Sequence, residues 1–99
     1  MPKSAFAANS QAKVCAAAVA KLLAGEQAPQ PRLINTCYSL VAPDYGITVA
    51  GVYEPRDGQL ADVKGAGGVS PAKADRAARE LEANYANGWF KTITEEVFG

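Results

Sequence analysis

The chain has 99 residues, with ten basic and ten acidic side chains, two cysteines, no histidine and a formal net charge of zero. This length predicts a single domain over residues 1–99, and the neutral charge argues against a nucleic-acid partner, which would require clustered positive charge. The lack of histidine removes the usual general base near neutral pH and the commonest metal ligand. Since two cysteines are too few for a zinc site, we expect no metal. No apolar run is long enough to span a membrane.

The first predicted element is an alanine-rich helix over residues 5–24. Its apolar residues recur at helical spacing, so we expect one face of the helix to be buried. That face consists of Ala8, Ala12, Cys15, Val19 and Leu22. Gly25 is the expected C-terminal stop. Cys15 is therefore predicted to lie in the interior.

Two β-strands are predicted at residues 33–41 and 46–54, joined as an antiparallel hairpin. The second strand is rich in β-branched residues and contains Gly51, which indicates a bulge or a close backbone neighbour. A strong turn signal follows, so residues 59–64 are predicted to return as a short third strand. The glycines of residues 65–68 begin like a dinucleotide-binding fingerprint, but the third glycine is misplaced, and we expect a loop.

A long helix is predicted over residues 72–97, with Ser70 as its N-cap and Pro71 at its first helical position. Glu80 and Glu82 are expected on its solvated face. Its apolar face is expected to consist of Ala74, Ala78, Leu81, Tyr85, Trp89, Ile93 and Val97, with Tyr53 of the second strand and Tyr85 in the core. The predicted fold class is therefore α+β: a three-stranded antiparallel sheet packed with an N-terminal alanine-rich helix and a long C-terminal helix.

Two stretches of the sequence resemble a known family. One is the apolar strand of residues 33–41, with Cys37 at its centre and the turn Ala42-Pro43-Asp44-Tyr45-Gly46 after it. The other is the opening block, residues 2–15. Together they resemble the C-terminal part of the flavoprotein subunit of flavocytochrome c sulfide dehydrogenase. The likeness runs along the chain from near residue 2 to residue 99.

The resemblance implies a redox role for Cys37, which lies in the stretch Asn-Thr-Cys-Tyr-Ser at residues 35–39. It would form one half of a redox-active disulfide beside FAD, with a second cysteine upstream of Met1. Cys15 is a poor substitute for that partner because its expected position is buried. Hydrosulfide would attack the disulfide, and two electrons would pass to the flavin and leave singly to a c-type cytochrome. Without the resemblance, a lone strand cysteine is more often a small buried apolar residue.

The resemblance also implies the cofactor contacts. Lys3 and Ser4 precede the first helix, whose N-terminus would point at the pyrimidine end of the flavin and stabilise negative charge there. Without the resemblance, this is an ordinary capped surface helix. Tyr38 and Trp89 would lie close to the flavin, although core packing alone also explains aromatic residues at these positions.

The resemblance further implies that the chain is the C-terminal piece of a larger FAD-dependent, disulfide-reductase-like flavoprotein of the periplasm, with any targeting signal upstream. The upstream FAD-binding domains would be missing, so we expect the isolated chain to bind no FAD and to be inactive. We also expect it to hide its flavin-facing apolar surface by self-association or by an altered hairpin.

Two other interpretations remain at this level. The chain could be a non-catalytic interaction or dimerisation module that uses its sheet face. It could also be the equivalent domain of a sulfide:quinone oxidoreductase, but such an enzyme would carry a membrane-associating amphipathic helix at its C-terminus. Residues 72–97 are rather charged for that role.

Overall fold

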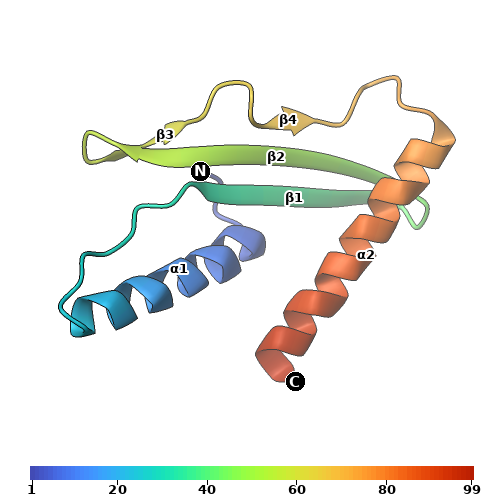
Figure 1. The fold of residues 1–99 in the computed structure, drawn as a ribbon. Coiled ribbons are helices and arrows are strands. Elements are labelled where there is room, and N and C mark those ends of the chain that lie inside the picture. The colour runs from blue at the N-terminus through green and yellow to red at the C-terminus, as the bar shows by residue number, and fades with distance from the viewer. The chain divides into compact units, whose positions relative to one another are not determined.

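The computed structural model describes all residues from Met1 to Gly99 and contains two helices and one four-stranded sheet (Figure 1). In chain order the elements are α1 (Ala5–Leu23), β1 (Leu33–Ala42), β2 (Tyr45–Arg56), β3 (Gln59–Asp62), β4 (Gly68–Val69) and α2 (Arg76–Phe98). The strand order is β1-β2-β3, and β4 also pairs with β2. The predicted α+β class is confirmed, with β4 as an additional short strand where a loop was expected.

The chain divides into two compact units. The first unit contains Met1–Thr36 and Ala50–Gly67, and therefore α1, β3 and one part of each long strand. The second contains Cys37–Val49 and Gly68–Gly99, and therefore β4, α2 and the remaining parts of β1 and β2. Neither helix is long and apolar enough to cross a membrane.

Helix α1 begins as its sequence predicts. Ser4 is the N-cap, and its hydroxyl accepts a hydrogen bond from the backbone N–H of Ala7 at 3.1 Å. The same hydroxyl donates to Oδ1 of Asn35, which lies on β1 and is buried. This side-chain contact joins the start of α1 to β1 within the first unit.

The end of α1 also follows the prediction. Gly25 has a φ of +76°, in the left-handed region that other residues rarely adopt. The N–H of Gly25 bonds to the carbonyl of Leu22 at 3.1 Å, and the N–H of Glu26 bonds to the carbonyl of Lys21 at 3.0 Å. These bonds satisfy carbonyl groups of the last turn, so the helix stops there.

The prediction of which face of α1 is buried is wrong. The residues of the predicted face are all exposed, including Val19 at 49%, Leu22 at 59% and Cys15. The buried position is Ala7, and Gln11 and Val14 on the same face are half-buried. Because alanine and valine occur on both sides of this helix, apolar spacing does not select one side. The contact of Ser4 with Asn35 gives the physical reason for the observed orientation.

Gly51 in β2 has the close backbone neighbour that the sequence indicates. A Cβ built on Gly67 would lie 3.1 Å from Cα of Gly51, and the phenol ring of Tyr53 occupies the space of the missing Gly51 side chain. Tyr53, which was predicted to be a packing residue, is half-buried. It lies opposite Asp62 in the antiparallel pairing of β2 with β3.

Helix α2 begins later than predicted. Its N-cap is Asp75, whose carboxylate accepts from the backbone N–H of Ala78 at 2.8 Å. Ser70 is a competing cap by residue type, but its hydroxyl accepts from the backbone N–H of Thr48 at 2.7 Å and donates to Glu82. The prediction of Ser70 and Pro71 as the helix start is therefore wrong, because Ser70 is committed to β2.

The predicted inner face of α2 is wrong as well. Leu81, Tyr85 and Val97 are 49%, 55% and 60% exposed, so Tyr85 is not a core residue. The buried positions of α2 are Arg79, Ala83 and Ala86, whereas the predicted face residues Ala78, Trp89 and Ile93 are half-buried.

The burial of Arg79 explains why α2 buries a different face from the predicted one. Nη2 of Arg79 donates to the carbonyl of Pro71 at 2.6 Å, and Nη1 lies 3.7 Å from the carboxylate of Glu82. Its guanidinium also lies 5.1 Å from the ring centroid of Tyr45. Glu82, which was expected on the solvated face, is thus half-buried with partners, and that prediction is wrong. Glu80 is exposed as expected.

Gly46 is expected to be the least replaceable glycine in the second unit. In Gly46→Ala, the added Cβ would collide with the backbone nitrogen of Ala83 and lie 2.6 Å from the carbonyl carbon of Glu82, and helix backbone cannot move aside. We expect a loss of about 2 kcal/mol or more in the free energy of unfolding, measured by urea titration with Trp89 fluorescence.

Gly88→Ala is the matched control. Gly88 lies within α2, and a Cβ there meets no atom within 4 Å. This substitution should instead stabilise the protein by about 0.5–1 kcal/mol, because alanine loses less conformational entropy in a helix. Equal effects of the two substitutions would contradict the close packing of β2 on α2.

Candidate flavin site

Cys37 lies on β1 in the second unit and is half-buried. Its neighbour Tyr38 points to the opposite face of the strand, because successive residues of a strand alternate. No disulfide joins Cys37 to Cys15, which is exposed on α1. The prediction that Cys15 is buried is wrong.

Two predicted cofactor contacts come together in the second unit. The rings of Tyr38, on β1, and Trp89, on α2, have centroids 6.0 Å apart and planes tilted by 38°. This geometry is favourable for an aromatic pair. Sequence spacing does not predict the contact, because β2, β3 and β4 separate the two residues along the chain.

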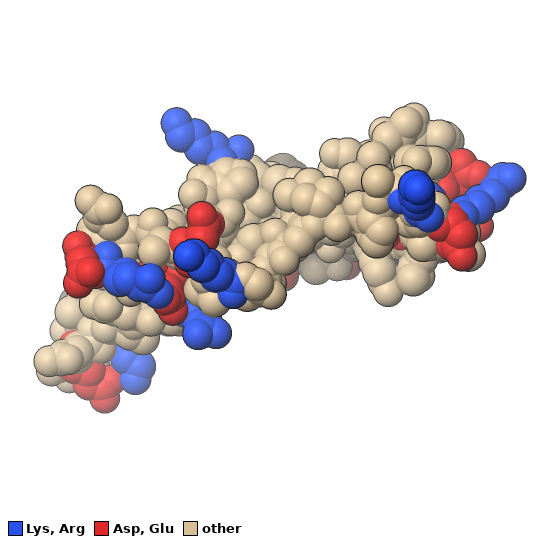
Figure 2. Space-filling view, turned by 90° about the horizontal axis from the view of Figure 1, so that it is seen from above, with Lys and Arg blue, Asp and Glu red and all other residues tan.

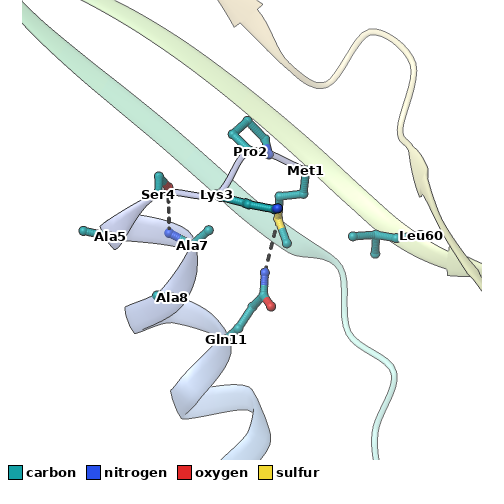
Figure 3. A pocket seen from close by; sticks show the side chains of 9 residues that line it. All are labelled: Met1, Pro2, Lys3, Ser4, Ala5, Ala7, Ala8, Gln11 and Leu60. Carbon is teal, nitrogen blue, oxygen red and sulfur yellow. Dashed lines mark hydrogen bonds between the residues drawn. The ribbon is translucent and has the colours of Figure 1, made fainter.

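The other two predicted contacts lie together in the first unit. Lys3 and Ser4 line a cavity of about 650 Å³ at the start of α1, where Gln11 donates to the sulfur of Met1 at 3.5 Å (Figure 3). The other lining residues are Pro2, Ala5, Ala7, Ala8 and Leu60. The predicted residues thus form two groups, Lys3 with Ser4 and Tyr38 with Trp89, in different units.

The cavity in the first unit has the chemistry for an electron-rich, flat group. Lys3 is the one charged side chain among its lining residues, and the N-terminus of α1 adds a positive end of the helix dipole. Ala5 and Ala8 are small, so a planar ring can approach the helix closely. These residues fit the pyrimidine edge of a flavin, which carries negative charge when the ring is reduced.

Sequence reasoning missed one residue of this region, Asn35. It is 1% exposed and is bonded to the hydroxyl of Ser4. The available signal was the one amide side chain of the predicted strand, since polar side chains are seldom fully buried without a specific partner.

The charged side chains of the chain are not concentrated in a patch of one sign on the face that Figure 2 shows. Basic and acidic side chains lie intermixed there. Arg32 lies 3.6 Å from Glu54, and Arg76 lies 3.1 Å from Asp44, so several bases already have acidic partners. No group of three potential ligand side chains could hold a metal ion.

A family model described as flavocytochrome c sulphide dehydrogenase, flavin-binding, matches residues 29–98. The matched residues include Cys37, Tyr38 and Trp89, whereas Lys3 and Ser4 lie before them. The resemblance described from the sequence is thereby confirmed. Because the match covers well over half of the chain, the protein belongs to the flavin-binding domain family of flavocytochrome c sulphide dehydrogenase.

Proposed function

We propose that this chain covers the FAD of a sulfide:cytochrome c oxidoreductase and supplies Cys37 as one half of a redox-active disulfide. The observation that carries the proposal is the family match over residues 29–98, which includes Cys37 and its neighbours. Cys37 is half-buried on a strand, where its position is fixed by the sheet. Its partner would be a cysteine of the FAD-binding domains with which residues 1–99 work as one C-terminal domain.

The chemistry of such a disulfide requires no histidine. Hydrosulfide attacks one sulfur of R–S–S–R′, the S–S bond breaks, and the products are the persulfide R–S–SH and the thiolate R′–S⁻. The sulfide sulfur is oxidised by two electrons and the disulfide is reduced by two. A bound flavin supplies a two-electron acceptor that can release its electrons singly to a c-type cytochrome.

The remaining site residues would hold and orient the flavin. Lys3 and the Ser4-capped start of α1 supply positive potential at the first unit's cavity. In the second unit, Tyr38 and Trp89 offer an apolar surface of paired rings. Without the FAD-binding domains these groups cannot form a complete site, so we propose that the chain alone is inactive. A periplasmic location would match the use of a c-type cytochrome.

Thiol labelling tests the role of Cys37. In the oxidised complete flavoprotein, with its FAD-binding domains and FAD, maleimide is expected to label Cys15, which is exposed, and to label Cys37 only after reduction of the disulfide. Cys37→Ser should reduce sulfide oxidation to the background rate, whereas Cys15→Ser should leave it unchanged. Rapid labelling of Cys37 in the oxidised protein would rule out the disulfide.

Trp89 is expected to contact the flavin, and the next residue gives a matched control. Trp89 is half-buried against Tyr38, whereas Phe90 is 63% exposed. Trp89→Leu should change the visible absorbance spectrum of the bound flavin, because a ring beside it is lost, and Phe90→Leu should not. Identical spectra for the two variants and the wild type would place Trp89 away from the cofactor.

The electron acceptor distinguishes the two sulfide-oxidising enzyme classes. We expect the sulfide-reduced protein to be reoxidised rapidly by a c-type cytochrome and slowly by a soluble quinone, as followed by stopped-flow absorbance. Helix α2 is rather charged for the membrane-associating amphipathic helix expected of the quinone-linked enzyme. Faster reoxidation by quinone would favour the quinone-linked enzyme instead.

A further inference from the structure

The most deeply buried large side chain of this protein is polar. Asn35 is 1% exposed, whereas the buried apolar residues are all alanines. Removing an amide from water costs free energy unless its hydrogen bonds are made inside the protein. An apolar side chain of similar volume would fill the same space without that cost, so packing alone does not explain an asparagine here.

The hydrogen bond of Asn35 explains what the amide does. Its Oδ1 accepts from the hydroxyl of Ser4, and that hydroxyl accepts in turn from the N–H of Ala7 at 3.1 Å. One hydroxyl therefore connects the first turn of α1 to an amide that is fixed in β1. Since such a bond is directional, it sets the orientation of the helix start as well as its position.

The same helix start lines the cavity that has Lys3 as its one charged lining side chain. The positive potential of a helix N-terminus falls off within the first turn. Its effect on a bound group consequently depends on where that turn is held.

We propose that Asn35 is a positioning residue that acts through Ser4 to set the reduction potential of the flavin. The inference rests on the proposed function, in which the start of α1 faces the pyrimidine end of the ring. Negative charge gathers there on reduction, so a helix start held in place favours the reduced form. Release of that turn from Asn35 makes the potential more negative.

The reduction potential of the complete FAD-loaded flavoprotein, in which this chain is joined to its FAD-binding domains, tests this role. Asn35→Leu and Ser4→Ala should each shift the potential to a more negative value. The double variant should shift it no further than the larger single effect, because both substitutions remove the same Ser4–Asn35 hydrogen bond and Ser4→Ala also removes the cap bond from Ala7. Ser4→Thr keeps the hydroxyl and should retain the wild-type potential. Asn84→Leu, at an exposed amide on α2, is the control and should have no effect.

A further variant separates failure of this inference from failure of the proposed function. Lys3→Gln removes a charge at the cavity directly, so it shifts the potential if the flavin lies there. A shift with Lys3→Gln but none with Asn35→Leu would overturn the role of Asn35 and leave the proposed function intact. No shift with either variant would overturn both the role of Asn35 and the placement of the flavin at this cavity. Additive shifts in the double variant would also overturn the coupling of Asn35 to Ser4.

Flavin content and circular dichroism identify a variant that fails to fold. If Asn35→Leu does not retain FAD, the comparison of Ser4→Ala with Ser4→Thr carries the test. These two variants differ in the hydroxyl that Asn35 binds. Equal potentials for them would overturn the proposal.

Discussion

The position of α1 in the first unit depends on the hydrogen bond between Ser4 and Asn35, because little apolar surface is buried there. The buried apolar residues of the whole chain are Ala7, Ala83 and Ala86. An alanine side chain removes only a small area from water, so it stabilises a helix on a sheet weakly. In the second unit, hydrogen bonds also join the segment before α2 to the helix: Arg79 donates to the carbonyl of Pro71, and Ser70 donates to Glu82. Polar contacts of this kind fix geometry more than they add stability.

Both helices present large apolar side chains to solvent. On α1 these include Leu22, and on α2 they include Tyr85, which are 59% and 55% exposed. Single exposed apolar residues are ordinary on a protein surface, but several on one helix are typical of a surface that another chain or domain covers. Under the proposed function, the FAD-binding domains would cover exposed apolar residues of α2.

The elements were predictable where the signals are local. Strands β1 and β2, the start of α1 at residue 5 and the stop at Gly25 depend on neighbouring residues, and all follow the sequence. The faces of the helices were not predictable, because alanines are apolar on every side and because burial of Arg79 requires carbonyl groups from outside the helix. At the candidate site, family resemblance drew attention to Cys37, but only the fold brings Tyr38 and Trp89 together.

The exposure of Cys15 affects how the protein must be handled. An exposed thiol on a helix surface is open to air oxidation and to covalent linkage between two copies of the chain. Preparations that preserve a redox-active disulfide must omit reducing agents, and those same conditions leave this second thiol unprotected. Replacing it with serine before any redox titration would remove a source of covalent dimers that has no connection with sulfide chemistry.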